Sequence, residues 1–426
     1  MIAGQIGEIK NVKIKQSLED FVVRERPAGK GGTDGAFVLY RMTKRGIGTM
    51  EAVGELCRML GIPSRRVSFG GLKDRHAISE QTIAIRQGPA RNFNHPRFDL
   101  QCIGRSPRPF APSSFTANHF TIAIRDLARE QAETILSRLE EVRSCGIPNY
   151  YDDQRFGSLR GSSGEFIARA LIAGDFERAL RLAIASPSFE DQKRERAIKK
   201  TIAARWGDWT TCKAELPRSS ERSIVTYLVD HPTDFRRAFD LINHNLKVLY
   251  LSAYQSYLWN RILSAFLEQR VGRDSLVAYP FVAGNLWFHR TMESAAARKL
   301  AETTIPFPMR TTVFPDPLLA RIADALMAEE KLAMRDLKIR GMKQLFFSRG
   351  ERRTLLIPSG IEPSPIADDE LNGGKVKLTL AFELPRGSYA TILIKRLTFD
   401  METRRHPRGT GETEQNPLTG EGRSLQ

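Results

Sequence analysis

The sequence contains few cysteines and histidines, and their spacing matches none of the common metal-binding motifs. Its 426 residues include four cysteines, no two of which form a C-x-x-C pair: Cys57, Cys102, Cys145 and Cys212. Scattered cysteines are typical of a reducing compartment and argue against a zinc site. The seven histidines contain no H-x-x-x-H pair, so we expect no metal site.

Long apolar runs are also absent. No stretch reaches the ~18 apolar residues of a membrane-spanning helix, and the N-terminal MIAGQIGEIKNVKIKQ lacks the apolar segment of a secretory signal. We therefore expect a cytoplasmic protein without a membrane span. The chain is long enough for two or three domains, and its 41% of hydrophobic and 27% of charged residues form an ordinary globular composition.

Positive charge, by contrast, is in excess. The 65 lysine and arginine residues outnumber 49 aspartate and glutamate residues, which gives a formal net charge of +16. This excess suggests a polyanionic partner such as a nucleic acid, although a merely basic protein would show the same total. The charge is spread, with local density at DQKRERAIKK and MRDLKIRGMK, which favours a folded binding face over a disordered arm.

Hydrophobic periodicity predicts α/β structure at both ends of the chain and a mainly helical middle. Thr49 is expected to cap a helix that ends at Gly61, and Asp175 a helix in the middle region. HFTIAIRDL and KVKLTLAFELP alternate as strands, and LSAYQSYLWNRILSAFLEQ forms a long amphipathic helix whose Tyr and Trp favour core packing over base stacking. This order is the pattern of one domain interrupted by an insertion.

One carboxylate stands among cationic or protonatable groups in the stretch RRVSFGGLKDRHAISEQTIAIR. Asp74 follows Lys73 and precedes Arg75 and His76, on a Gly-Gly turn between two predicted strands. Positive charge nearby favours the ionised form of a carboxylate, and an ionised carboxylate on a turn can act as a nucleophile or a base. Spacing alone favours the simpler interpretation, which is an ion pair that pins the loop.

The stretch IPNYYDDQRFGS combines aromatic, amide and basic side chains. Asn149 and Gln154 are able to bind a base edge, the aromatic residues to stack on a base, and Arg155 to hold a phosphate. A buried polar turn after a helix is an equally good interpretation of the same residues.

The stretch LPRGSYATILIKRL predicts a strand that ends and a helix that begins. Ser388 is expected to cap a helix starting with Tyr389, which would then lie at the positive end of that helix, and Lys395 and Arg396 could reach a carboxylate or a phosphate. An ordinary junction between a strand and a helix explains the pattern equally well.

Taken together, these motifs resemble the tRNA pseudouridine synthase D (TruD-like) family over about residues 10–400. Six stretches match in order: IKQSLEDFVVRE, GLKDRHAISEQ, FTIAIRDL, IPNYYDDQRFG, LSAYQSYLWN and LPRGSYATILIKRL. The resemblance implies an α+β fold, in which a pseudouridine synthase-like catalytic domain of mixed sheet and helices is interrupted by a mainly helical α/β insertion domain. We expect catalytic parts at 1–170 and 345–400, the insertion at 171–344 and a disordered tail at 401–426.

The resemblance also implies the reaction, which is the isomerisation of uridine to pseudouridine in tRNA, at position 13, without a cofactor or a metal. Asp74 lies where the family has its catalytic aspartate. The expected partner is tRNA, and the expected state is a monomer. The residues that match substrate-binding positions of the family are Phe21, Asn149, Tyr151, Tyr389 and Lys15.

Two positions depart from the family's usual pattern. The family has N-Y-F-G-x-Q-R-F-G, whereas Asp152 stands here in place of the first glycine. If that glycine has a positive φ, Asp is among the more tolerable substitutes. The usual Arg-Glu-Leu near the C-terminus is Lys395-Arg396-Leu397 here, and a lysine offers a point charge without the bidentate fork of an arginine.

Two rival functions remain on sequence grounds. A non-catalytic RNA-binding protein or RNA chaperone would explain the charge, but not the Lys-Asp motif beside ordered aromatic residues. A metal-free hydrolase that uses Asp74 would need a partner acid or histidine, and none stands at a persuasive position. The product separates all three functions, because pseudouridylation leaves the mass of the RNA unchanged yet moves uracil to a carbon linkage.

Overall fold

The computed structural model describes residues 8–9, 12–29, 31–160, 164–187 and 191–401. The strands are β1 (Glu8–Ile9), β2 (Val12–Lys13), β3 (Phe21–Pro27), β4 (Phe37–Arg45), β5 (Val67–Phe69), β6 (Ile78–Arg86), β7 (Phe93–His95), β8 (Phe98–Ser106), β9 (Phe115–Leu127), β10 (Ile147–Pro148), β11 (Leu276–Phe281), β12 (Gly284–His289), β13 (Thr304–Pro306), β14 (Glu351–Arg353), β15 (Leu355–Leu356), β16 (Ser359–Pro363), β17 (Ala367–Asp368) and β18 (Val376–Pro385).

The helices begin in the N-terminal third and dominate the middle of the chain. They are α1 (Thr49–Leu60), α2 (Arg129–Cys145), α3 (Ile167–Ala173), α4 (Phe176–Ile184), α5 (Lys193–Ala204), α6 (Trp209–Glu215), α7 (Ser220–Asp230), α8 (Phe235–Asp240), α9 (His244–Val271), α10 (Ser294–Glu302), α11 (Pro317–Glu329) and α12 (Ala390–Thr398), and the 3-10 segment η3 (Asp153–Arg160) is kinked at Phe156.

Most of the strands belong to one mixed sheet. Within the described residues, twelve strands join it, and its main path runs β1-β2-β9-β3-β6-β4-β8-β7, with β18 paired to the long strand β9. β3 and β6 pair in parallel, whereas β4 with β6, β4 with β8 and β3 with β9 pair antiparallel. The predicted mixed sheet with helices is therefore confirmed.

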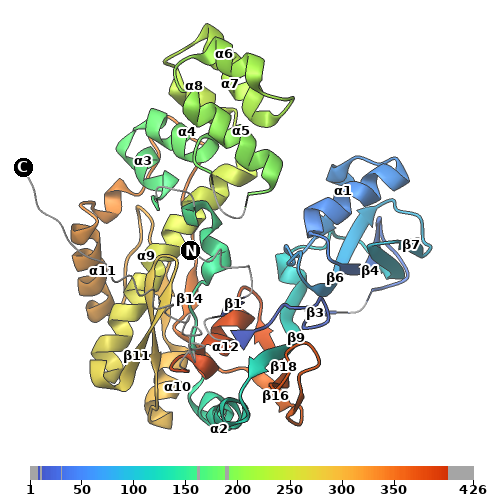
Figure 1. Cartoon of the computed structure of the whole chain (residues 1–426), viewed down its shortest axis with the longest axis vertical. Helices are drawn as coiled ribbons and strands as arrows, with labels where there is room; N and C mark the ends of the chain where they lie inside the picture. Colours follow the sequence, from blue (N-terminus) through green and yellow to red (C-terminus); the bar gives the residue numbers. More distant parts are fainter. Residues whose placement is uncertain (1–7, 10–11, 30, 161–163, 188–190, 402–426) are drawn as a thin grey trace, which may run out of the picture.

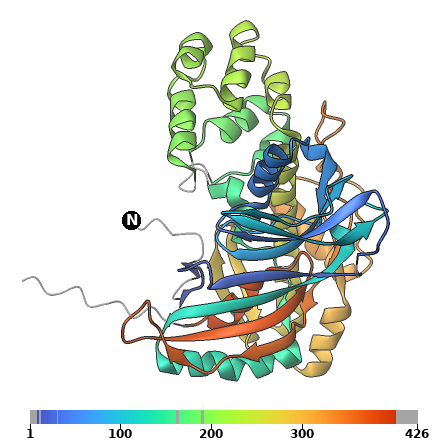
Figure 2. The same ribbon diagram turned by 90° about the vertical axis from the view of Figure 1, so that its right-hand side faces the viewer.

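Three groups of elements are visible in Figure 1. β4, β6, β7 and α1 form a lobe on one side, helices α3–α8 gather at one end, and β9, β18, α2 and α12 lie in the body with α9–α11. The lobe has its own hydrophobic core, which includes Tyr40, Leu56 and Ile83. Figure 2 shows α2 lying along the face of β9 and β18, away from the end that α3–α8 occupy.

Several local predictions are confirmed, among them one helix cap and the buried aromatic residues of a long helix. Asp175 caps α4 by accepting a hydrogen bond from the backbone N–H of Arg178. The aromatic residues Tyr254 and Trp259 of α9 are fully buried in the core, as their spacing predicted. No described helix is both long enough and apolar enough to cross a membrane.

Two predicted helix caps are wrong. Gly48 is the N-cap of α1, because the Thr49 hydroxyl instead donates a hydrogen bond to Gln81 Oε1 at 2.8 Å. Tyr389, and not Ser388, is the N-cap of α12, which begins at Ala390. The backbone N–H of Ser388 donates a hydrogen bond to the carbonyl of Pro385 at 3.3 Å, which closes a turn before the helix.

Two of the predicted domain limits fall within residues that the structure describes. The limit between residues 170 and 171 lies inside α3, so the helical region begins a few residues before the predicted position. Met401, the first residue of the predicted tail, is buried, and the rest of that tail lies outside the described residues.

Candidate active site

Parallel pairing of β3 and β6 brings two predicted motifs to one edge of the sheet. Val22 of β3 is opposite Ile78 of β6. Because parallel strands start at the same edge, the segment that leads into β3 and the loop that leads into β6 must meet there. The first carries Lys15 and Phe21, and the second carries Asp74.

The loop that carries Asp74 is held by its backbone. Thr49 Oγ1 accepts a hydrogen bond from the backbone N–H of Lys73 at 2.9 Å, and Lys44 Nζ donates to the carbonyl oxygen of Asp74 at 2.6 Å. Burial lowers the pKa of Lys44 to about 8, against the opposite effect of the Asp74 carboxylate. At the start of the loop, a Cβ on Gly70 would lie only 2.7 Å from the Phe115 ring, so the close approach of the loop requires a glycine there.

The carboxylate of Asp74 faces two side chains from distant parts of the sequence. Lys15 Nζ lies 2.6 Å from Oδ2, and Gln154 Nε2 lies 2.9 Å from Oδ1 and 2.8 Å from Oδ2. The Lys15 side chain is only 3% exposed, whereas that of Asp74 is 29% exposed. A buried lysine side chain therefore sits behind a carboxylate that solvent still reaches.

The cations next to Asp74 in the sequence do not surround its carboxylate. Lys73 Nζ instead lies 3.0 Å from Glu25 Oε1 and donates to Asn118 Oδ1 at 2.6 Å. Arg75 pairs with Glu51 at 2.7 Å. The expectation that the neighbours in the sequence surround the carboxylate is thus wrong for Lys73 and Arg75. The ion pair that holds Asp74 is made with Lys15 instead.

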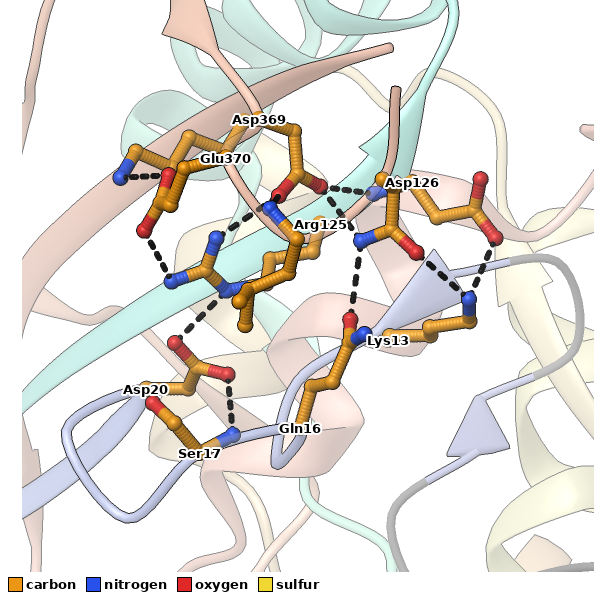
Figure 3. A network of polar contacts seen from close by, with 11 residues as sticks. Lys13, Gln16, Ser17, Asp20, Arg125, Asp126, Asp369 and Glu370 are labelled. Atoms are coloured by element: carbon orange, nitrogen blue, oxygen red, sulfur yellow. Dashed lines mark hydrogen bonds and ion pairs between the residues drawn. The ribbon is translucent and has the colours of Figure 1, made fainter.

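Phe21 lies directly against Lys15. The ammonium of Lys15 is 4.3 Å from the centroid of the Phe21 ring, which is a cation–π distance. The adjacent Asp20 accepts hydrogen bonds from Arg125 Nε and from the backbone N–H of Ser17, both at 2.8 Å. Figure 3 shows this network, which continues through Arg125 to the acidic pair Asp369 and Glu370 and so fixes the segment that carries Lys15 and Phe21.

Asn149 lies in the segment that precedes η3 and is 5% exposed. Its Nδ2 donates to the carbonyl of Arg353 at 3.0 Å, and its backbone N–H donates to the carbonyl of Thr354 at 2.9 Å. These bonds fix the amide orientation, because a carbonyl cannot face another carbonyl. Among the described residues Asn149 Oδ1 has no hydrogen-bond partner, so a buried acceptor is left over.

Tyr151 and Tyr389 form an aromatic cluster with Arg352. The Tyr151 and Tyr389 rings meet edge to face at 6.1 Å, and the Arg352 guanidinium lies 4.4 Å from the Tyr151 centroid. Arg352 donates to the carbonyls of Asn149 and Gly387, both at 2.7 Å. Burial raises the pKa of Tyr389 and lowers that of Arg352. The helix α9 fixes the Tyr151 backbone through the side-chain amide of Asn260, whose Oδ1 accepts from the Tyr151 N–H at 2.9 Å and whose Nδ2 donates to the Tyr151 carbonyl at 2.8 Å.

The structure therefore connects all six predicted site residues through two adjoining clusters. Lys15, Phe21 and Asp74 form the first, and Asn149, Tyr151 and Tyr389 form the second. Gln154 joins the two, because it follows Tyr151 closely in the chain and contacts Asp74. The sequence indicated Gln154 as a base-edge ligand, but not as a partner of Asp74.

Sequence reasoning missed Arg352 and Lys44 altogether. Neither lies in a quoted motif, and both are recognisable only after folding, since each donates to a backbone carbonyl of a residue far along the chain. Among the described residues, no group of three or more His, Cys, Asp or Glu side chains could hold a metal ion. Chemically, the site offers one reachable carboxylate beside an ammonium, with aromatic and amide groups at its rim.

Comparison with known proteins agrees with these motifs. The family model described as tRNA pseudouridine synthase D (TruD) matches residues 8–397. A probable tRNA pseudouridine synthase D 1 of Methanococcus maripaludis is 31% identical over 392 residues, which cover 91% of this chain and 99% of that protein. A tRNA pseudouridine synthase D of Geobacter sulfurreducens is 30% identical over 398 residues, which cover 90% and 93% of the two chains.

A solved structure is similar as well. The crystal structure of the putative tRNA pseudouridine synthase D from Methanosarcina mazei matches with a TM-score of 0.64 and 26% sequence identity. The match covers 90% of this chain and 92% of that chain, so it extends over most of the sheet and of the helical region.

Proposed function

The chain belongs to the tRNA pseudouridine synthase D family, and we propose on that premise that it acts on uridine 13 of tRNA with Asp74 as the catalytic group. Its activity is that of a tRNA pseudouridine synthase, which is an isomerase. The observation that best supports the choice of residue is the pairing of the Asp74 carboxylate with Lys15, inside the segment that the family model matches.

The reaction breaks the bond between N1 of uracil and C1′ of the ribose, turns the base and joins C5 to C1′. Asp74 would act as a nucleophile toward the sugar or the base, or as a base toward the ribose. Each of these roles needs an ionised carboxylate with a reachable oxygen. The 29% exposure of the Asp74 side chain supports a reachable oxygen, and the Lys15 ammonium lies 2.6 Å from the carboxylate.

The detached uracil would be held by the residues at the rim. Tyr389 is half-buried and would present a ring face for stacking, with Phe21 and Tyr151 lining the same site. Asn149 Oδ1, which lacks a partner among the described residues, would accept a hydrogen bond from N3–H of uracil. Lys15 would affect the substrate indirectly, because its positive charge lies beside the carboxylate of Asp74.

The target nucleotide has to leave its stack before it can reach Asp74. Extrusion of a base costs a few kcal/mol, and contacts between basic side chains and phosphates would offset that cost. We propose that residues 171–344 serve as the insertion domain, and that they supply part of these contacts together with the catalytic parts at 1–170 and 345–400.

An unmodified tRNA transcript tests both the activity and the position. We expect the purified protein to convert one uridine to pseudouridine without changing the mass of the RNA. We expect mapping to place the pseudouridine at nucleotide 13 of the tRNA. A protein that only binds RNA would leave every uridine N-linked. Conversion at another position would refute the choice of uridine 13 alone.

A further inference from the structure

The two positions that depart from the family's usual pattern meet in space. Lys395 of α12 donates hydrogen bonds to the carboxylates of Asp152 and of the adjacent Asp153, the latter at 2.7 Å. The side chains of Lys395 and Asp152 are only 5% and 4% exposed. The aspartate in place of a glycine and the lysine in place of an arginine are therefore a single buried pair and not two separate changes.

The two carboxylates favour the charged form of Lys395. Burial by itself would lower the pKa of Lys395, but the two carboxylates outweigh burial and raise it. A buried ion pair is costly to desolvate, and removing one partner leaves the other buried and uncompensated. The arrangement therefore resists any movement that would separate α12 from the turn at Asp152 and Asp153.

That turn leads directly to the candidate catalytic carboxylate. The backbone N–H of Arg155 donates to the carbonyl of Asp152 at 2.7 Å, which closes the turn around Gln154. Gln154 Nε2 lies within 2.9 Å of both carboxylate oxygens of Asp74. Asp153 Oδ1 also accepts a hydrogen bond from the backbone N–H of Val282 at 3.0 Å, so the turn is held on a second side.

The same helix places the aromatic residue of the site. Tyr389 is the N-cap of α12, and Lys395 lies six residues further along, or roughly 9 Å along the axis at 1.5 Å per residue. A shift of α12 would consequently displace the Tyr389 ring and the Gln154 amide together. The buried pair thus connects the stacking side of the site to its carboxylate side.

We propose that Lys395 is a positioning residue for Asp74, which acts by fixing the turn at Asp152 and Asp153 so that the amide of Gln154 orients the Asp74 carboxylate. This proposal rests on the proposed function of Asp74. Lys395 is buried away from the surface that RNA would contact, so its loss should change turnover and leave tRNA affinity intact.

The test compares Lys395→Met with Lys395→Arg in the full chain. We expect kcat to fall roughly tenfold or more in Lys395→Met, with KM for tRNA within about threefold, and we expect Lys395→Arg to keep most of the turnover because it retains the charge. Lys247→Met is the matched control. Lys247 of α9 is another buried lysine, and its Nζ lies 2.7 Å from Oδ1 of Asp240 at the end of α8. This variant should leave kcat unchanged.

A double variant separates positioning from simple charge compensation. Lys395→Met with Asp152→Asn removes the uncompensated buried charge, so its melting temperature should recover relative to Lys395→Met alone. If Lys395 positions the turn, kcat stays low in the stable double variant. Recovery of wild-type kcat would overturn the proposal, because it would show that Lys395 only neutralises Asp152.

A double-mutant cycle and hydrogen exchange complete the test. Gln154→Ala should cost little further kcat in the Lys395→Met background, since both act through one contact, and full additivity would count against the proposal.

Exchange of the backbone amides of residues 149–156 reports on the turn without any turnover. Faster exchange in Lys395→Met supports the anchor even if the wild type proves inactive, which would refute the proposed function instead. Unchanged exchange overturns the anchor.

Discussion

Asp74 obtains its contacts from residues that are distant in the sequence. Lys15 lies 59 positions away and Gln154 lies 80 positions away, whereas Lys73 and Arg75 pair with other acids. The charge that surrounds a residue in the sequence is thus a poor guide to the charge around its carboxylate. The contacts of the carboxylate depend instead on which loops the strand pairing brings to the same edge of the sheet.

This environment predicts the effect of removing Lys15. Lys15→Met takes away the ammonium that lies 2.6 Å from Asp74, so kcat should fall by at least about tenfold, the factor that about 1.4 kcal/mol of lost stabilisation gives. The affinity for tRNA should change little, because the Lys15 side chain is buried. Single-turnover rates and filter binding on the same preparation measure both quantities.

Arg75→Met is the control for that prediction. Arg75 stands next to Asp74 in the sequence but pairs with Glu51, so turnover at saturating tRNA should stay near that of the wild type. An equal loss of turnover in both variants would show that the local sequence, and not the folded contact, sets the state of Asp74.

His289 makes a separate prediction about pH. Burial, and then the nearby Arg396 guanidinium, lower the pKa of His289 from 6.5 to about 3. Below pH 6.5 the unfolded chain therefore binds a proton that the folded chain does not, and stability is lost at up to ~1.4 kcal/mol per pH unit as the pH falls from 6.5 toward 3. The contribution is fully present above the unfolded pKa of 6.5.

The measurement is the free energy of unfolding in urea at about pH 7 and about pH 5. Between these values the wild type should lose about 2 kcal/mol more than His289→Phe, which carries no titrating ring. Equal losses in the two proteins would mean that His289 is protonated in the folded state.

At the scale of single elements, apolar periodicity predicted more than capping did. α9 and β18 follow directly from their patterns, because burial of an amphipathic face outweighs local preferences. Thr49 was expected to cap α1, yet its hydroxyl bonds Gln81 and the Lys73 backbone instead. Where a hydroxyl has both a local and a buried distant partner within reach, its hydrogen-bond partner cannot be assigned from the sequence.

The sequence indicated candidate site residues where a motif contains them and not elsewhere. Asp152 and Lys395 were both recognised as unusual, but their pairing spans 243 positions and has no local signal. Arg352 likewise lies in no motif, although it holds the backbone of Asn149. Such contacts depend on how β14, η3 and α12 are placed by the rest of the fold.

The network of Figure 3 yields a prediction about the stability of this sheet edge. Arg125→Leu would leave the carboxylates of Asp20 and Asp369 buried without a cation, since their side chains are 1% and 0% exposed. We expect the free energy of unfolding to fall by about 3–5 kcal/mol. Arg205→Leu, which breaks an exposed pair with Glu215, is the control and should shift the urea midpoint little.

At the scale of the whole molecule, the excess of positive charge predicts how tRNA binding responds to salt. With a net charge of +16, several phosphates should be contacted, and each one adds roughly −0.7 to −0.9 to the slope of log K against log salt. Filter binding across a salt series measures that slope. A flat line would contradict an extended phosphate-binding face spread over the lobe, the body and the helices α3–α8.

Substitution of Asp74 by asparagine tests the central claim most directly. The asparagine side chain has nearly the shape of the aspartate, so the loop held by Lys44 and Thr49 should survive, but an amide can neither attack the substrate nor take up its proton. We predict that Asp74→Asn forms no pseudouridine while it binds tRNA within a few-fold of the wild type. Pseudouridine yield close to that of the wild type in this variant would contradict the assignment of Asp74 as the catalytic group.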